Sequence, residues 1–369
     1  MELIYQGKKS INAIFDLATN NLPSTAIEIP KDHNLFIFGD NFKALSILLN
    51  HGLKGAIDLI YIDPPYNTNQ IFTVSNDERV STISRSKDHN ALIAYNDNYT
   101  ITEYLEFMRE RLLLMKELLS EQGSLYVHID SKMGHYLKLI LDEIFGIDNF
   151  INDISRIKSN PKNFKRRAYG NEKDIILFYA KNHKKNIFNN ITEPLSENDK
   201  IKMFHKVDSD GRRYNTVPVH APGETLNGDT GQEWKGMLPP KGRHWRASPE
   251  ELDKLDAQNL IEWSKNGVPR IKKFADEHKG KKIQDIWRFK DPMYPIYPTE
   301  KNADMLEMLI AQSSNQNSIV LDCFAGSGST LKAAEKLSRK WIGVDISPIS
   351  LKVIQKNLDK ADFQLIMLD

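Results

Sequence analysis

Short apolar runs alternate with helical patterns on both sides of a long irregular stretch of the chain. The apolar runs have strand length and cover residues 35–38, 57–62, 124–129, 175–179, 319–322 and 341–344. Apolar residues with helical spacing cover 42–49, 100–120, 133–145 and 329–337. This alternation predicts a parallel α/β sheet, and its resumption near the C-terminus predicts that an insertion interrupts the sheet.

The helix expected at 100–120 has the clearest signals. Thr100 and Glu103 have the spacing of a capping box, in which each side chain bonds the other residue's backbone N–H. Apolar residues then recur every three or four positions, and Gly123 is expected to stop the helix before the next strand.

The stretch between the two halves differs from them in texture and charge. Residues 182–282 show no sustained alternation, so we divide the chain into 1–181, 182–284 and 285–369. Residues 151–290 hold 29 lysines and arginines and 19 aspartates and glutamates, a net charge of +10, whereas the rest has a net charge of −9. A basic middle region indicates contact with a polyanion, and a solvated lysine-rich surface is the alternative.

Several classes of protein are excluded. The single cysteine, Cys323, rules out a disulfide within the chain and a cysteine-rich zinc site. The ten histidines show no metal-ligand spacing, so we expect no metal, and His128 is expected to be a core residue. The first ten residues lack the apolar core of a signal peptide, and no run reaches the ~18 apolar residues of a membrane span. We therefore expect a cytoplasmic protein without membrane contact.

A glycine-rich loop follows the strand at 319–322. Its sequence is Asp322-Cys323-Phe324-Ala325-Gly326-Ser327-Gly328-Ser329-Thr330. It lacks the lysine of a phosphate-binding P-loop, and Leu331 replaces the third glycine of the dinucleotide fingerprint. The loop therefore suits a nucleoside ligand without a pyrophosphate, and Asp345 can accept ribose hydroxyls at the end of the next strand. A tight turn without a ligand is the alternative.

The sequence Asp63-Pro64-Pro65-Tyr66 follows the strand at 57–62, at the edge where open α/β sheets bind ligands. The prolines fix the backbone, so the Asp63 carboxylate and the Pro64 carbonyl become rigid acceptors. Acceptors on both N–H bonds of an adenine amino group would expose its lone pair. Tyr66 would stack on a base extruded from the duplex. Together the two motifs predict methyl transfer to an amino group, although a proline-rich turn is the alternative for this motif alone.

The chain resembles the amino-group DNA methyltransferases of bacterial restriction–modification systems, in the permuted order called the β class. In that order the Asp-Pro-Pro-Tyr motif comes first, a target-recognition region follows, and the Phe-x-Gly-x-Gly motif comes last. Blocks that look like those of the family stand in the same order at 39–41, 63–68, 285–287, 297–301 and 322–330. The resemblance looks closest to type III modification subunits and their stand-alone relatives. It implies a circularly permuted, Rossmann-like α/β fold that binds S-adenosylmethionine.

The resemblance also implies roles for single residues. The implied catalytic residues are Asp63, Pro64, Pro65 and Tyr66. The implied cofactor-binding residues are Asp40, Thr299, Lys301, Asp322, Phe324, Ala325, Gly326, Ser327, Gly328 and Asp345. The chain departs from the family at Asn302, where proline is common. Duplex DNA is the implied substrate, and a second copy of the chain and a restriction subunit are candidate partners.

Basic residues near aromatic ones are candidate DNA contacts. They are Lys162, Lys165, Arg166 and Arg167, beside Phe164 and Tyr169, and Arg243 and Arg246, beside Trp245. The first group would bind phosphates, with a solvated loop as the alternative, and the second would read base edges. Trp245 itself is expected in the core of a small domain. Residues 75–99 either close over the extruded base or form an inert loop.

We expect N6-adenine methylation of a specific duplex sequence. N4-cytosine methylation uses the same chemistry, but its enzymes more often have serine in place of Asp63. Protein glutamine methylation is disfavoured because that motif begins with asparagine, and the basic insertion favours duplex DNA over RNA. Methylation at carbon 5 of cytosine needs a nucleophilic cysteine after a proline, whereas Cys323 follows Asp322 and is expected to pack behind the loop. The intact motifs argue against a binding module that has lost catalysis.

Overall fold

The structure is a computed structural model of the chain. It describes residues 2–20, 22, 33–74, 80–82, 92–160, 167–295, 297–298 and 300–368. The chain forms two compact units. The larger unit comprises Met1–Ile191 and Gln284–Asp369, and the smaller unit comprises Thr192–Ile283. Within the described ranges, none of the helices combines the length and the apolar character that crossing a membrane requires.

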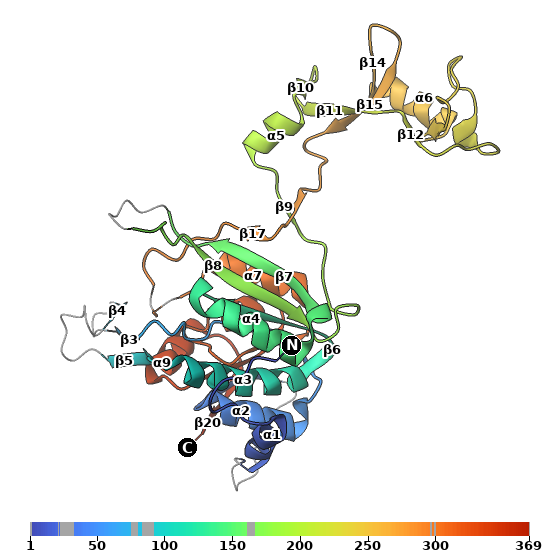
Figure 1. The fold of residues 1–369 in the computed structure, drawn as a ribbon. Helices are drawn as coiled ribbons and strands as arrows, with labels where there is room; N and C mark the ends of the chain where they lie inside the picture. The colour runs from blue at the N-terminus through green and yellow to red at the C-terminus, as the bar shows by residue number, and fades with distance from the viewer. Residues whose placement is uncertain are drawn as a thin grey trace. The chain divides into compact units, whose positions relative to one another are not determined.

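In the described part of the larger unit, nine strands form one sheet in the order β17-β7-β8-β6-β2-β18-β19-β1-β20. Figure 1 shows β7 and β8 of this sheet side by side. The strands are β1 (Asn34–Phe38), β2 (Ile57–Ile62), β6 (Leu119–Ile129), β7 (Phe150–Ile157), β8 (Lys173–Ala180), β17 (Ile286–Trp287), β18 (Ile319–Asp322), β19 (Lys340–Asp345) and β20 (Phe363–Met367). The pairings are parallel except the two that β8 makes with β6 and β7. Strand β18, late in the chain, lies between β2 and β19, so the two halves of the sequence meet in mid-sheet. The fold is the expected Rossmann-like α/β fold in a circularly permuted chain order, but the sheet is mixed and not purely parallel as predicted, because β8 runs antiparallel to both of its neighbours.

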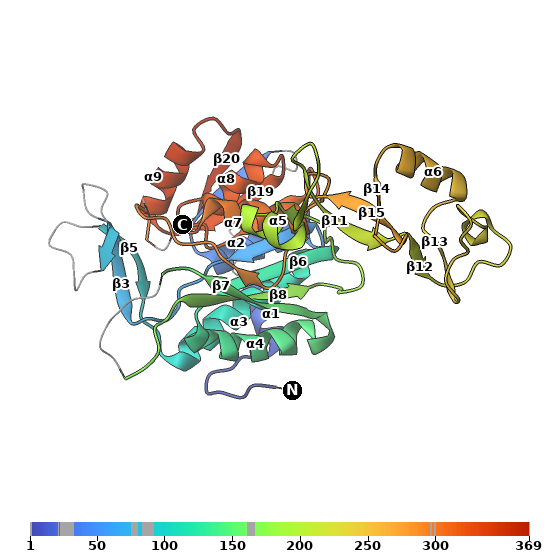
Figure 2. The same cartoon turned by 90° about the horizontal axis from the view of Figure 1, so that it is seen from above.

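Helices cover both faces of this sheet. One layer comprises α1 (Ile11–Asn20), α2 (Asn41–Leu48), α3 (Ile101–Leu118) and α4 (Ser131–Phe145), which pack successively against one another. Figure 2 shows the other layer, α7 (Ala303–Ser313), α8 (Ser329–Lys336) and α9 (Pro348–Asn357), on the opposite side. Single helical turns occur at η1 (Leu49–Leu53), η2 (Ile147–Asn149) and η3 (Asp229–Gly231). The apolar stripe of α3, with Leu112 and Met115 buried, packs into the core.

The N-terminus of α3 confirms the predicted capping box. The Thr100 hydroxyl accepts from the Glu103 backbone N–H at 3.3 Å, and the Glu103 carboxylate accepts from the Thr100 N–H at 2.9 Å. The predicted end of this helix was wrong, because α3 ends at Leu118 and Gly123 lies inside β6. A Cβ at Gly123 would lie 2.8 Å from the Ile57 carbonyl oxygen. The close approach of β2 therefore explains this glycine.

A three-stranded antiparallel sheet follows the Asp-Pro-Pro-Tyr motif. It consists of β3 (Gln70–Val74), β4 (Val80–Thr82) and β5 (Leu92–Asp97). Phe72 and Tyr95 stack across β3 and β5, with ring centroids 4.7 Å apart. The region predicted as irregular at 75–99 therefore contains two strands, β4 and β5, and its residues 75–79 and 83–91 lie outside the described residues.

The smaller unit has its own core, although its sequence shows no sustained alternation. Its elements are α5 (Glu197–Met203), α6 (Pro249–Ala257), β9 (Thr192–Glu193), β10 (Lys206–Val207), β11 (Arg213–Pro218), β12 (His220–Pro222), β13 (Arg243–Trp245), β14 (Ile261–Trp263), β15 (Pro269–Phe274) and β16 (Lys281–Lys282). Trp234 and Trp245 are both 2% exposed and pack edge to face at 6.0 Å. The expectation that Trp245 is a core residue is confirmed.

Candidate active site

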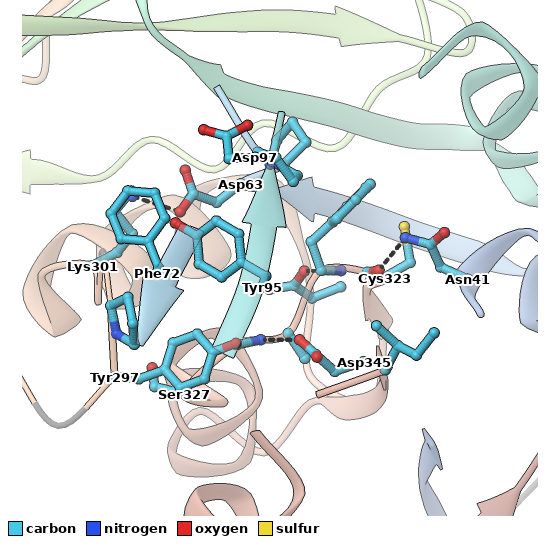
Figure 3. A pocket seen from close by; sticks show the side chains of 18 of the residues that line it. Asn41, Asp63, Phe72, Tyr95, Asp97, Tyr297, Lys301, Cys323, Ser327 and Asp345 are labelled. Carbon is cyan, nitrogen blue, oxygen red and sulfur yellow. Dashed lines mark hydrogen bonds and ion pairs between the residues drawn. The ribbon is translucent and has the colours of Figure 1, made fainter. Parts of the chain in front are cut away.

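A cavity of about 460 Å³ opens at the C-terminal ends of the central strands. Its wall includes residues that directly follow β1, β2, β18 and β19, which are neighbours in the sheet. The two sequence motifs, Asp63–Tyr66 and Asp322–Thr330, therefore contribute to one site (Figure 3). This is the edge, beside the point where strand order reverses, at which open α/β sheets bind ligands. The volume suits a small-molecule ligand.

The Asp63 carboxylate is held from two sides. The Tyr66 hydroxyl donates to Asp63 Oδ1 at 2.8 Å, and the Lys301 ammonium lies 2.5 Å from Oδ2, as Figure 3 shows for the lysine. Burial, with the charge of Asp63 added, raises the pKa of Tyr66 well above its ordinary value, so this hydroxyl keeps its proton. The Tyr104 hydroxyl of α3 donates to the Pro65 carbonyl at 2.6 Å and fixes the turn.

Asp97, at the end of β5, fixes the backbone that follows Tyr66. Its carboxylate accepts from the Asn67 N–H at 2.6 Å and from the Thr68 N–H and hydroxyl at 2.9 and 2.7 Å. Asn67 has φ 54°, a left-handed conformation that needs such support. Asp97 also lines the cavity, but nothing in the sequence singled it out, because an aspartate in a polar stretch is ordinary.

The glycine loop is folded around Asp345. Its carboxylate accepts from the Gly326 N–H at 2.7 Å and from the Ser347 N–H at 2.8 Å. Gly326 and Gly328 have φ of 52° and 75°, and a Cβ at Gly328 would lie 2.7 Å from Ile354 Cγ1. Burial raises the pKa of Asp345 to about 6. Asp345 therefore shapes the loop and also contributes to the cavity wall.

Asp322 begins the loop and is 2% exposed. It accepts from the Phe324 N–H at 3.0 Å. Burial raises the pKa of Asp322 to about 7, with hydrogen bonds from Thr330 and Phe324 opposing the shift. This carboxyl group gains its proton near neutral pH.

Arg111, which was not predicted from the sequence, holds two residues of the cavity wall, Asp40 and Asn41. The Arg111 guanidinium of α3 stacks over Phe107 at 3.6 Å, and it donates to Asn41 at 2.5 Å and to Asp40 at 3.2 Å. Phe107 in turn packs edge to face against Phe324 of the glycine loop. Arginine within an amphipathic helix usually faces solvent, so the sequence alone did not reveal this role.

Three buried polar side chains, those of Tyr61, His128 and Asp174, contact one another in sequence. His128 is fully buried, as expected of a core residue, and its Nδ1 lies 2.8 Å from the Tyr61 hydroxyl. Its Nε2 lies 3.4 Å from Asp174, which also pairs with Lys158 at 2.6 Å. Burial lowers the pKa of His128, which favours the neutral imidazole. Lys158 reaches the cavity wall from the end of β7.

The structure brings most of the predicted cofactor residues together. The cavity is lined by Asp40, Lys301, Asp322, Phe324, Ala325, Gly326, Ser327 and Asp345, as well as by the catalytic candidates Asp63, Pro64, Pro65 and Tyr66. Gly328 forms the turn into α8. Arg167 is exposed in the larger unit, and Arg243 and Arg246 are exposed in the smaller one, whereas Lys162, Lys165, Arg166 and Thr299 lie outside the described residues. In the described part of the chain no cluster of three His, Cys, Asp or Glu side chains could hold a metal ion.

Comparison with known proteins identifies the family. A family model described as DNA methylase, of the N6/N4 methyltransferase type, matches residues 57–356. The chain is 45% identical over 332 residues to the type II methyltransferase M.EcaI of Enterobacter cloacae, covering 88% of this chain and 69% of that protein. The chain belongs to the N6/N4 DNA methylase family. This methylase is also 28% identical over 369 residues to the StyLTI Mod subunit of Salmonella typhimurium, covering 90% of this chain but 54% of the subunit.

Solved structures of similar proteins include the M1.HpyAVI–SAM complex, at a TM-score of 0.44 and 18% identity over 88% of this chain and 99% of that one. S-adenosylmethionine is the cofactor of the family. The cavity of this methylase fits such a group, because its wall combines two aromatic rings, Phe107 and Phe324, with the half-buried carboxylate of Asp345 and the glycine loop.

Proposed function

We propose that this methylase transfers the methyl group of S-adenosylmethionine to the N6 amino group of adenine within a specific sequence of duplex DNA. The observation that carries the proposal is the convergence of Asp63, Tyr66 and the glycine loop on one cavity. The description of the family, DNA methylase, supports DNA as the substrate. A restriction subunit and a second copy of the chain remain candidate partners.

Bound S-adenosylmethionine supplies an electrophilic methyl group. The glycine loop, with Gly326 and Phe324, would hold its methionine part. Asp345 would accept hydrogen bonds from the ribose hydroxyls through the lone pairs that its bonds with backbone N–H groups leave free. Asp40 and the Phe107 ring would hold the adenine end, positioned by Arg111. These assignments use the donors and acceptors that line the cavity.

The Asp-Pro-Pro-Tyr motif would receive the target base. Asp63 would accept one N–H of the amino group and the Pro64 carbonyl the other, so that the nitrogen lone pair points at the methyl carbon. Lys301 and Tyr66 fix the Asp63 carboxylate before the base arrives, which lowers the cost of orientation in the reaction. The Tyr66 ring offers a face on which the extruded base can stack.

Mass spectrometry of nucleosides tests the proposal. Plasmid DNA is incubated with the purified chain and S-adenosylmethionine labelled in its methyl group, and Asp63→Ala serves as the matched inactive variant. We expect labelled N6-methyladenine with the wild-type chain and none with the variant, which should keep its cofactor affinity. Labelled N4-methylcytosine would support the proposed methyl transfer to an amino group but contradict adenine as the target base. Activity of Asp63→Ala would contradict the role of the carboxylate.

A further inference from the structure

The segment between β17 and α7 exposes two adjacent large side chains. Met293 is 83% exposed and Tyr294 is 86% exposed. Single exposed apolar residues are common on protein surfaces, but two in succession offer a larger area whose burial against a partner would be favourable. The position of the two residues indicates which partner they meet.

Contacts on both sides hold this segment at the cavity. On the N-terminal side, Asp291 pairs with Arg156 at 2.6 Å, and its N–H donates to the carbonyl of Lys158, which lines the cavity. On the C-terminal side, Tyr297 is 5% exposed and also lines the cavity. An extended chain spans at most ~3.6 Å per residue, so the Cα of Tyr294 lies within ~11 Å of that of Tyr297. The exposed pair therefore lies close to the cavity wall.

We infer that Met293 and Tyr294 form a wedge that enters the base stack of duplex DNA at the place that the target base leaves. The inference rests on the proposed function and adds the element that extrudes the base. Apolar side chains inserted between base steps unstack them, and an aromatic ring can replace the lost stacking. Arg288 and Lys290 are exposed in the same segment and favour the phosphate backbone over a protein partner.

The test compares methylation of two DNA substrates that carry the recognition sequence found by mapping modified sites. One is a perfect duplex, and the other has a mismatched base opposite the target, which reduces the cost of extrusion. The wedge variant is Met293→Ser combined with Tyr294→Ser. Ile147→Ser is the matched control, because Ile147 is 68% exposed but precedes β7, at the opposite end of that strand from Lys158. Met293→Leu combined with Tyr294→Phe keeps an apolar wedge.

We expect the wedge variant to lose about 10- to 100-fold in kcat on the perfect duplex and to recover most of that loss on the mismatched one. The conservative variant and Ile147→Ser should match the wild type on both substrates. An equal loss on both substrates, or no loss on either, would overturn the wedge while leaving the proposed function in place. If the wild type methylates neither substrate, the proposed function fails and the wedge with it.

Discussion

At the scale of single residues, Lys301 is the position where sequence and structure suggest different roles. Its place in a family block implies cofactor binding, whereas its ammonium lies 2.5 Å from Asp63 and 5.4 Å from the centre of the Tyr66 ring. With 8% of its side chain exposed, this lysine is well placed to orient the carboxylate. Its removal should therefore affect the catalytic step and not the binding of the cofactor.

We therefore predict that Lys301→Met lowers kcat by about 10- to 100-fold, the equivalent of a lost charge-assisted hydrogen bond, and leaves the Kd of S-adenosylmethionine nearly unchanged. Single-turnover kinetics and calorimetric titration measure the two quantities. Lys336→Met, which removes an exposed partner of Glu307, is the control and should change neither. A large rise in Kd with a normal rate would restore the cofactor role implied by the sequence.

The burial of Asp322 makes stability depend on pH. Its pKa is about 7 in the folded chain and about 3.9 in an unfolded one, so between these values the folded state binds more protons. Its contribution to stability is therefore present at low pH and is lost as the pH rises through 7.

Asparagine at this position keeps an acceptor for the Phe324 N–H but carries no charge. Asp322→Asn should gain stability relative to the wild type between pH 5 and pH 8, on the order of 2 kcal/mol. Thermal unfolding of the free protein at several pH values measures this difference. Asp359→Asn, at an exposed position, should show no such trend. A pH-independent difference would contradict the buried-charge account.

The sequence could predict the residues that a motif carries, and not those that reach the site through packing. Asp63, Tyr66 and Gly326 were predicted because their neighbours in sequence define a turn and a strand end. Arg111 and Asp97 were not, because their roles depend on which elements pack around them. Motif residues are close to one another in sequence. In contrast, Arg111 contacts a residue 70 positions away, and Asp97 contacts residues 29 and 30 positions away.

At the scale of elements, the loop between β18 and α8 depends on backbone conformation. Gly326 has φ 52°, and a Cβ there would lie 3.2 Å from the Tyr297 ring in the cavity wall. Gly55 has a similar φ of 70°, but a Cβ at that position would have no neighbour within 4 Å. A side chain would therefore strain the backbone at both glycines, but only at Gly326 would it contact a neighbouring residue.

We predict that Gly326→Ala and Gly55→Ala each lower the free energy of unfolding by about 1 kcal/mol. Only Gly326→Ala should also raise the Kd of S-adenosylmethionine, by about tenfold, because its methyl group pushes on Tyr297 at the cavity. Thermal unfolding and calorimetric titration separate the two effects. Equal affinity in both variants would argue against the glycine loop as the cofactor site.

Regular elements were predictable where their sequences carry a clear apolar pattern, whereas helices α1, α7 and α9 were missed although each is ten or eleven residues long. The strands expected at 57–62 and 319–322 coincide with β2 and β18, whose buried faces produce continuous apolar runs. Strand β7 was missed because buried and partly exposed residues mix along it. The strands of the smaller unit were missed because they are two to six residues long, too short for a repeating pattern.

At the scale of the whole molecule, each of the two units has a distinct feature. The larger unit contains the cavity, and the smaller unit contains a separate core around Trp234 and Trp245. Its surface carries Arg243, which hydrogen-bonds His220, and Arg246, which donates to the Pro218 carbonyl. These neutral partners leave both guanidinium groups with a full positive charge, available to phosphates or bases.

The affinity for DNA should therefore fall with salt in a straight line on logarithmic axes, with a slope that counts the phosphates neutralised. Arg243→Gln combined with Arg246→Gln should make that slope shallower by about 2 if both bind phosphates, and should weaken discrimination between sequences if they read bases. Arg212→Gln is the matched control in the same unit, because Asp276 and Glu277 already neutralise Arg212, and it should leave the slope unchanged. Fluorescence anisotropy of labelled duplexes over a range of salt concentrations measures the slope. An unchanged slope and unchanged discrimination in the double variant would place the DNA contacts of the basic region elsewhere.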